Sequence, residues 1–260
     1  MHVDMRVSFI SIFPEMILQH LEYGVIGRAV NQGAVDLQIY NPRDYANNVN
    51  RNVDAQPFGG GPGMVMMAEP LIRSVAAARE ESSFCGPVIL MSPQGRQFDH
   101  KMASELSKLD EIILVSGRYE GVDQRFIDKE VDLEISIGDF VLSGGELAAL
   151  VILDATARLT TGLLGNPESI NFDSYVDGLL EFPQYTRPQE LNVGDGKQND
   201  NHRSIPQVLL SGDHDRIDEW RKQKALEQTW EKRPDLLAGR SFSSEERQLL
   251  IDFIETGQTP

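Results

Sequence analysis

Short runs typical of β-strands alternate with runs of helical periodicity from Met5 to about Leu159, and this alternation constrains the fold more than any other feature. The expected strands cover residues 5–13, 35–42, 87–93, 111–117 and 132–137. The expected helices cover residues 14–30, 68–80, 100–109 and 122–130, and a long one begins near residue 145. Strands that alternate with helices build a mostly parallel sheet with helices on both faces. The sequence therefore predicts an α/β fold.

Three consecutive strands are each followed by a segment rich in glycine or proline. These segments are MSPQG at 91–95, SGRYEG at 116–121 and SIGDFVLSGG at 136–145. Ligands of parallel α/β sheets bind beyond the carboxyl ends of the strands. Ordinary turn chemistry, in which glycine supplies a positive φ and proline fixes a corner, would also explain each segment alone. Because all three follow neighbouring strands in the chain, we expect them to line one pocket, mainly with backbone groups.

The chain changes character after Leu159. Residues 163–206 are irregular and rich in Pro, Gly, Asn and Asp, which is typical of a functional lid or a linker. Helical patterns return at 206–237 and 243–256, where Asp213 and Ser243 are expected N-caps and Glu246 completes a capping box with Ser243. We therefore expect three parts. They are a catalytic domain (1–164), a linker or lid (165–205) and a small all-helical domain (206–260).

Composition limits the classes of function. The 260 residues carry a net charge of −16, which argues against a non-specific nucleic-acid binder with a broad basic surface but leaves room for an enzyme with a local basic patch. No segment approaches the roughly 18 uninterrupted apolar residues of a membrane span. The N-terminus is a poor secretion signal, and the single cysteine, Cys85, can form no internal disulfide. A cytoplasmic protein without a membrane partner is expected.

Several common chemistries have no support in the sequence. The GGGPGM stretch at 59–64 lacks the lysine and hydroxyl of a phosphate-binding loop, and no GxGxxG follows the first strand. The five histidines show no ligand spacing, so a zinc site is not expected. LSGGE is no nucleophile elbow, because that motif would need glycine in place of Val141. What remains is a pocket for an uncharged or zwitterionic, partly aromatic ligand. S-adenosylmethionine fits this description, although composition alone does not select it.

A set of motifs runs in order over nearly the whole chain and resembles one family, the bacterial tRNA (guanine-N1)-methyltransferases. The matching segments are SIFPEM at 11–16, GVIGRAV at 24–30, NPRDY at 41–45, PFGGGPGMVMM at 57–67, SPQGR at 92–96, GRYEGVDQR at 117–125, SIGDFVLSGGE at 136–146, GLLGN at 162–166, DSYVDGLLEFPQYTRP at 173–188 and VLLSGDHDRIDEWR at 208–221. Enzymes of this family methylate N1 of the guanosine at tRNA position 37, next to the anticodon, which maintains the reading frame.

The resemblance implies a catalytic domain of the SPOUT type, whose C-terminal part forms a deep trefoil knot. It also implies that the knot loops hold S-adenosylmethionine in a bent shape, and that two chains pair so that each active site uses residues from both. The residues that would then surround the methyl donor are Leu90, Ser92, Pro93, Gly117, Tyr119, Glu120, Ile137, Gly138, Asp139, Phe140, Val141, Leu142, Gly144 and Gly145.

Methylation of guanine N1 needs a base, because N1 carries a proton at neutral pH, and a positive group for the charge that develops on O6. The resemblance places these roles on Asp173 and Arg158. Without the resemblance, Asp173 would be a solvated turn aspartate or an N-cap. Arg158, at the end of the long apolar helix, would simply complement the helix dipole.

The resemblance also suggests a role for Mg²⁺. Members of the family are thought to use this ion, and Glu120, an acid beside the donor loop, is a candidate ligand. The residue types and their spacing alone predict no metal site. Glu120 could instead be the structural partner of Arg118 or Arg125.

Two regions are candidates for tRNA binding. In the family, the region around Gly59, preceded by Arg51 and Asp54, approaches the anticodon stem. The C-terminal helices carry the best basic cluster, which consists of Arg216, Arg221, Lys222, Lys224, Lys232 and Arg233. Arg221 and Lys222 are the candidates to position phosphates, with specificity coming from a flipped guanine. A charged helix face is, however, usually just solvated.

The chain departs from the family pattern at three places. Phe58 and Phe140 stand where tyrosine is common, and the polar segment 192–203 is longer than the usual connection. Two other functions remain open at this point. A knotted RNA ribose 2′-O-methyltransferase would share the donor loops but need not carry Arg158 and Asp173. A non-catalytic RNA-binding module would not need the pocket at the strand ends.

Overall fold

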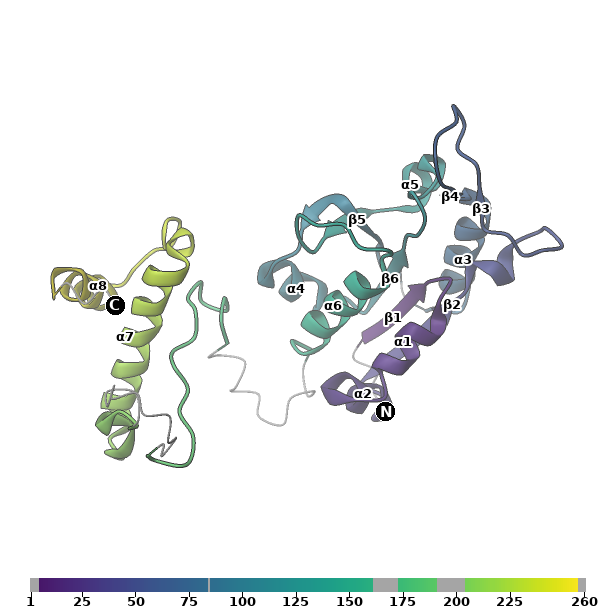
Figure 1. Ribbon diagram of the computed structural model, residues 1–260. Coiled ribbons are helices and arrows are strands. Elements are labelled where there is room, and N and C mark those ends of the chain that lie inside the picture. Colours follow the sequence, from purple (N-terminus) through teal and green to yellow (C-terminus); the bar gives the residue numbers. More distant parts are fainter. Residues whose placement is uncertain (1–4, 84, 161–172, 191–203, 257–260) are drawn as a thin grey trace, which may run out of the picture. The chain divides into compact units, whose positions relative to one another are not determined.

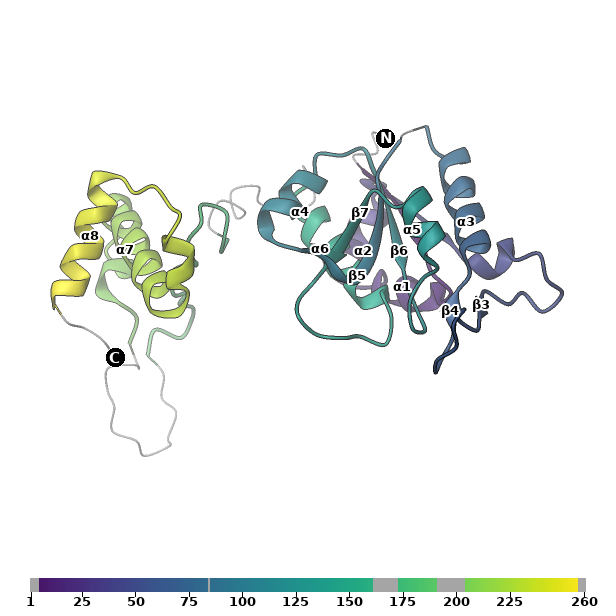
Figure 2. The same ribbon diagram turned by 90° about the horizontal axis from the view of Figure 1, so that it is seen from above.

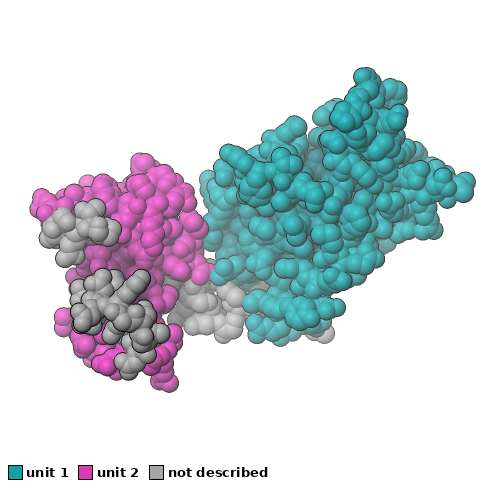
Figure 3. All heavy atoms as spheres, in the orientation of Figure 1, with its two compact units in different colours: residues 1–167 teal, residues 168–260 magenta. Residues whose placement is uncertain are grey.

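The structure of the chain is a computed structural model that describes residues 5–83, 85–160, 173–190 and 204–256 (Figure 1). It divides into two compact units, residues 1–167 and 168–260, which Figure 3 colours separately. The predicted division at 1–164, 165–205 and 206–260 stays a prediction. Its first boundary lies outside the described residues, and so does the polar segment 192–203.

Unit 1 is built on a five-stranded sheet in which all neighbouring strands are parallel. The strands, in spatial order, are β2 (Val35–Tyr40), β1 (Met5–Ile10), β6 (Glu111–Ser116), β5 (Val88–Gln97) and β7 (Leu133–Ser136). Every residue of β1 and β6 is buried, as expected for central strands covered on both faces. The predicted α/β class with a mostly parallel sheet is confirmed.

Helices cover the two faces of this sheet. One face packs against α1 (Pro14–His20), α2 (Gly24–Asn31), α4 (His100–Leu106) and α6 (Glu146–Ala157). The other packs against α3 (Ala68–Glu80) and α5 (Gln124–Glu130), as Figure 2 shows. A 3-10 turn, η1 (Pro42–Tyr45), and a short antiparallel hairpin of β3 (Asp54–Ala55) and β4 (Val65–Met66) precede α3.

The predicted helix over residues 14–30 was wrong, because the chain forms two helices there. α1 ends at His20, and α2 begins at Gly24, whose φ of +76° is incompatible with a continuous right-handed helix. Gly27 then lies so close to the carbonyl of Leu21 that a Cβ atom would overlap it. The apolar periodicity continues across the break, which is why the pattern suggests one helix.

Ionisable side chains are buried together near the start of β1. Arg6 lies 3.2 Å from Asp36 and 3.4 Å from Glu111, which is 1% exposed, and it donates to the Tyr40 hydroxyl at 3.2 Å. The Tyr40 hydroxyl donates in turn to Glu81 at 2.9 Å. Burial, followed by the hydrogen bond to the Glu81 carboxylate, raises the pKa of Tyr40 to about 12.

Unit 2 is helical over most of its described residues. It contains η4 (Gln207–Leu210), α7 (His214–Lys232), η5 (Pro234–Leu237) and α8 (Ser244–Thr256). Its core is small, and its buried members are Leu179, Ala225, Leu226 and Leu237.

The predicted caps of unit 2 are confirmed. Asp213 accepts from the Arg216 N–H at 3.2 Å. Ser243 and Glu246 form a reciprocal capping box, in which each side chain accepts from the backbone N–H of the other at 3.1 and 2.7 Å. Among the helices that the structure describes in either unit, none combines the length and the apolar character needed to cross a bilayer.

The raised pKa of Tyr40 predicts a defined loss of stability at alkaline pH. Below pH 10 the hydroxyl is protonated in both the folded and the unfolded chain. As the pH rises above 10, the unfolded chain releases this proton at a lower pH than the folded chain does. We expect the wild-type chain to lose about 1 kcal/mol more unfolding free energy than Tyr40→Phe between pH 9 and pH 11. Urea titrations of both chains at the two pH values measure this difference, and parallel losses would contradict it.

Candidate active site

A pocket of about 370 Å³ lies in unit 1 where β5, β6 and β7 end. Its walls come from residues 90–94, 117–122, 134–138 and 140–145, together with two residues of α5 and one of α6. Backbone groups and apolar side chains form much of the lining, and Glu120 and Glu134 add two carboxylates. The expectation that three strand-end segments line one pocket is confirmed.

The structure brings nearly all the predicted donor-binding residues into this pocket. The residues that line it are Leu90, Ser92, Pro93, Gly117, Tyr119, Glu120, Ile137, Gly138, Phe140, Val141, Leu142, Gly144 and Gly145. Asp139 is exposed and is not among the lining residues. The contact of these residues with a methyl donor stays a prediction.

The first wall is a β-bulge and not a loop beyond the strand. Met91 and Arg96 both align with Ile135 of β7, so the intervening residues 92–95 leave the ladder before β5 resumes and ends at Gln97. The predicted strand end at residue 93 was therefore wrong. Proline and glycine signal an interruption here, and the sequence pattern alone does not distinguish a bulge from a strand end.

Two glycines of the third wall are required by close packing. A Cβ atom on Gly145 would lie 2.8 Å from the Ser116 Cα and 3.0 Å from the Gly117 backbone N. At Gly144 a Cβ atom would overlap the Arg118 guanidinium. The Gly145 N–H also donates to the Gly117 carbonyl at 2.9 Å. Glycine is needed here because the third wall lies directly against the second.

The β3–β4 hairpin supports the second wall from outside. The Glu120 N–H donates to the Met64 carbonyl and the Met66 N–H to the Gly121 carbonyl, each at 2.9 Å. Gly63 lies so close to the Glu120 side chain that a Cβ atom would overlap it. The GGGPGM segment is therefore anchored at its base, and its tip protrudes beyond β3 and β4 (Figure 1).

The suggested ion pairs of Glu120 were wrong. Arg118 pairs with Glu146 at 2.8 Å, and Arg125 pairs with Asp123 at 2.6 Å and thereby lowers the pKa of Asp123. Within the described part of the chain, no group of three or more His, Cys, Asp or Glu side chains is arranged to hold a metal ion. A role of Glu120 with Mg²⁺ stays a prediction.

Sequence reasoning missed the buried carboxylate of Glu146. It is 0% exposed and accepts from the Ser11 hydroxyl and from Arg118 Nε, both at 2.8 Å. The available signal was an acid at the start of an otherwise apolar helix, which needs a partner if it is buried. Its partners are far away in the sequence, so the pattern could not name them.

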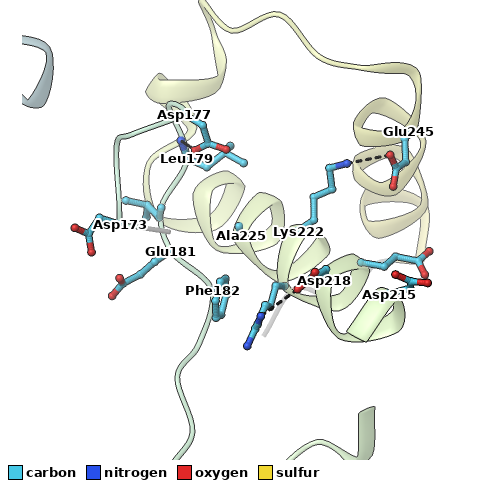
Figure 4. Close-up of a pocket in the computed structure, with 13 residues that line it drawn as sticks. Asp173, Asp177, Leu179, Glu181, Phe182, Asp215, Asp218, Lys222, Ala225 and Glu245 are labelled. Carbon is cyan, nitrogen blue, oxygen red and sulfur yellow. Dashed lines mark hydrogen bonds and ion pairs between the residues drawn. The ribbon is translucent and has the colours of Figure 1, made fainter. Parts of the chain in front are cut away.

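Asp173 lies in unit 2, on the wall of a second pocket of about 510 Å³. This pocket is lined by the 173–182 segment, by α7 and by Glu245 of α8. Figure 4 shows Asp173 and Glu181 on the same loop, with both carboxylates pointing away from α7. The loop is held to α7 by the Leu180 N–H, which donates to the Thr229 hydroxyl at 2.8 Å. Asp173 is therefore partly exposed on an anchored turn.

Arg158 lies in unit 1, at the C-cap of α6, and is exposed. Leu147, Val151, Asp154 and Arg158 are all exposed and follow at helical spacing, so they share one face of α6. The predicted catalytic residues Arg158 and Asp173 thus belong to different units, each of which the structure describes by itself.

The predicted tRNA-binding cations of α7 are paired with acids. Arg221 lies 3.0 Å from Asp218, and Lys222 lies 2.9 Å from Glu245. Arg221 also lies over the Phe182 ring at 5.1 Å. These pairs lower the net positive potential of this face, so α7 is less basic than its lysines and arginines suggest.

The other predicted tRNA-binding residues belong to the hairpin region of unit 1. Arg51 is exposed and lies 3.2 Å from Asp44, Asp54 begins β3, and Gly59 is exposed in the hairpin loop with a φ of +88°. The same hairpin supports the second wall of the strand-end pocket. Their contact with tRNA stays a prediction.

A parallel sheet with a pocket at its strand ends is the architecture of the α/β proteins, which typically bind ligands at this edge. Residues 5–239 match the family described as tRNA (Guanine-1)-methyltransferase TrmD. Proteins named tRNA (guanine-N(1)-)-methyltransferase are similar over almost their whole length. The one from Halorhodospira halophila is 47% identical over 249 residues, which cover 96% of this chain and 91% of that protein. The one from Stutzerimonas stutzeri is 49% identical over 250 residues, covering 96% of each chain.

The chain belongs to the tRNA (guanine-1)-methyltransferase family. The resemblance stated from the motifs is confirmed, and the chain is a methyltransferase enzyme. The comparisons give no support to a ribose 2′-O-methyltransferase or to a non-catalytic RNA-binding module.

The close packing of Gly145 predicts a structural cost for any side chain there. Gly145→Ala places a Cβ atom against backbone atoms that cannot move alone. We expect the unfolding free energy of unit 1 to fall by about 1–3 kcal/mol. Gly239→Ala is the control, because a Cβ atom at Gly239 meets nothing within 4 Å. Urea unfolding of both variants measures the effect, and equal midpoints would contradict the packing argument.

Proposed function

We propose that this protein transfers a methyl group from S-adenosylmethionine to N1 of the guanosine at position 37 of tRNA. The observation that carries the proposal is that three of the family motifs, SPQGR at 92–96, GRYEGVDQR at 117–125 and SIGDFVLSGGE at 136–146, meet at one strand-end pocket. The family and the names of the relatives support the reaction. Position 37 rests on the resemblance of the motifs.

The strand-end pocket of unit 1 suits S-adenosylmethionine, which supplies an already activated methyl group when it is bound. Leu90, Ile137 and Leu142 offer apolar contact for an adenine ring. The carboxylates of Glu120 and Glu134 favour a ligand with positive groups. We propose that these walls belong to the trefoil knot that is expected from the family.

Asp173 and Arg158 are the residues that act on the methyl acceptor, the guanine base. The Asp173 carboxylate takes the proton from guanine N1. Arg158, which is always charged, donates to O6, where negative charge develops. Both side chains are accessible, since Asp173 is half-buried and Arg158 is exposed, as a macromolecular substrate requires. The turn that carries Asp173 is anchored to α7, which limits the positions that the carboxylate can take.

This assignment predicts that Asp173→Ala abolishes turnover and leaves donor binding nearly intact. The variant removes the base, and Asp173 is not among the residues that line the strand-end pocket. Methylation of a tRNA with consecutive guanosines at positions 36 and 37 measures the rate, with and without Mg²⁺. Mass spectrometry of the digested product is expected to place the methyl group on N1 of guanosine 37. Calorimetric titration with S-adenosylmethionine measures donor binding.

Glu219→Gln is the control, because Glu219 lines the same pocket on α7 and has no assigned role. Asp173→Ala activity above about a tenth of wild type, a contribution of only ~1.4 kcal/mol, would show that Asp173 is not the base. A methyl group on the ribose 2′-oxygen would overturn the proposed reaction itself. Loss of rate without Mg²⁺ is the result expected if the ion takes part.

Two surfaces are proposed to bind tRNA. The hairpin region with Arg51, Asp54 and Gly59 borders the second wall of the donor pocket through Gly63. Arg221 and Lys222 would have to exchange their acidic partners, Asp218 and Glu245, for phosphates. This exchange makes their contribution sensitive to salt.

We also propose that two chains pair over α1 and α6. These helices pack against each other and expose large apolar side chains, among them Met16 on α1 and Leu147 and Val151 on α6. Exposed apolar residues that cluster on a surface mark sites of association. Arg158 lies on the same face of α6, so pairing here would bring it beside the second chain.

The proposed pairing predicts that Val151→Asp weakens self-association. A carboxylate in the centre of an apolar interface loses its water without gaining a partner. We expect a dissociation constant at least about a hundredfold higher than that of wild type, since a buried unpaired charge costs more than about 3 kcal/mol. Ile254→Asp on α8 is the matched control, because both residues are 46% exposed. Sedimentation equilibrium measures the dissociation constant of the dimer. A wild-type dissociation constant for Val151→Asp would exclude this face as the dimer interface.

A further inference from the structure

Glu146 is a buried acid that the proposed chemistry does not use. Glu146 is the first residue of α6, and it is 0% exposed. One oxygen accepts from the Ser11 hydroxyl and the other from Arg118 Nε, both at 2.8 Å. Burying a charge without such partners is strongly unfavourable, and an apolar residue would fill the same space at lower cost. A buried ion pair at this position therefore indicates a role other than stabilising the fold.

The partner guanidinium holds the third wall of the donor pocket. Arg118 Nη1 donates to the Ser143 carbonyl at 3.1 Å. Its guanidinium carbon lies 4.6 Å from the centroid of the Phe13 ring, and Nη2 contacts the Met16 sulfur at 3.4 Å. Gly144 has to be glycine because Arg118 fills the space of its Cβ atom. The guanidinium thus holds the backbone of residues 143–145 through the Ser143 carbonyl, and a second hydrogen bond joins the Gly145 N–H to the Gly117 carbonyl.

The geometry of arginine suits this task. Its planar fork points Nε at Glu146 and Nη1 at the Ser143 carbonyl at the same time, and lysine could make only a point contact. The Glu146 carboxylate orients the Arg118 guanidinium, and the guanidinium in turn orients the Ser143 carbonyl. A pocket that is formed before its ligand arrives does not spend binding free energy on ordering its walls.

We propose that Arg118 and Glu146 are positioning residues for the methyl donor, which hold the 143–145 wall in its binding-competent position. This inference rests on the proposed function of the strand-end pocket. Neither side chain is assigned to the base or to the charge on O6. Their effect is on donor affinity. Glu146 acts through Arg118, which holds the Ser143 carbonyl and also lines the pocket itself.

A purely structural role would give a different result from a positioning role, and three variants separate them. Arg118→Met and Glu146→Gln each leave one member of the pair alone and are expected to lower the melting temperature. The double variant Arg118→Met/Glu146→Gln removes both charges and keeps the acceptor for Ser11, so its melting temperature is expected to return towards wild type. If the pair serves stability alone, donor affinity returns with it.

The positioning role predicts that donor affinity does not return. In the double variant we expect the dissociation constant for S-adenosylmethionine, measured by calorimetry, to stay at least about tenfold above wild type. The affinity for tRNA, measured by filter binding without donor, is expected to stay within about twofold, because the side chains of the pair contact Ser11, Phe13, Met16 and Ser143, which lie outside the hairpin and α7. Arg118→Lys, which keeps the charge, tests the same point if the double variant does not fold. It is expected to bind the donor more weakly at a melting temperature close to wild type.

The Arg79–Glu130 pair provides the control. It has the same 2.8 Å separation and joins α3 to α5, away from the third wall. Arg79→Met is expected to leave the donor dissociation constant unchanged. Wild-type donor affinity in the double variant and in Arg118→Lys would overturn the inference. A wild-type chain that binds no S-adenosylmethionine would instead overturn the proposed function, so the two failures are distinguishable.

Discussion

The strands of the central sheet all run in the same direction, and the placement of the site depends on this constraint. Parallel pairing puts the carboxyl ends of β5, β6 and β7 at one edge, so segments that are separated in the sequence by α4 and by α5 meet there. The meeting is close. The Gly145 N–H donates to the Gly117 carbonyl, and a single added carbon at Gly145 would strike the backbone of Ser116 and Gly117 and the Met91 side chain. Glycine is required where these walls touch, and apolar side chains and the carboxylates of Glu120 and Glu134 line the space between them.

The two units divide the proposed chemistry. Unit 1 carries the strand-end pocket and Arg158, and unit 2 carries Asp173 on a turn anchored to α7. The donor needs no nucleophile from the protein, so unit 1 mainly has to bind and orient it. The acceptor needs a base and a cation, and these come from residues that are accessible in their own units. This arrangement agrees with a substrate too large to enter the pocket of unit 1.

Local and periodic features could be predicted from the sequence, and contacts between distant residues could not. The strand–helix alternation predicted all five sheet strands, and the Asp213 cap and the Ser243–Glu246 capping box were evident from neighbouring residues. The break at Gly24 was missed because the apolar periodicity continues across it. The bulge at 92–95 was missed because proline and glycine mark a strand end as well as a bulge. The Ser11–Glu146–Arg118 contacts join residues up to 135 positions apart, and no pattern along the chain encodes them. The basic cluster of α7 was overestimated for the same reason, since Glu245, the partner of Lys222, lies on another helix.

The central claim is that the three strand-end walls of unit 1 hold S-adenosylmethionine. A crystal structure of the full chain grown with S-adenosylmethionine tests it most directly. The account predicts continuous density for the ligand between residues 90–94, 117–122 and 134–145, with its polar edges on backbone groups of the glycine-rich walls. Ligand density at another place, with this pocket filled only by solvent, would contradict it.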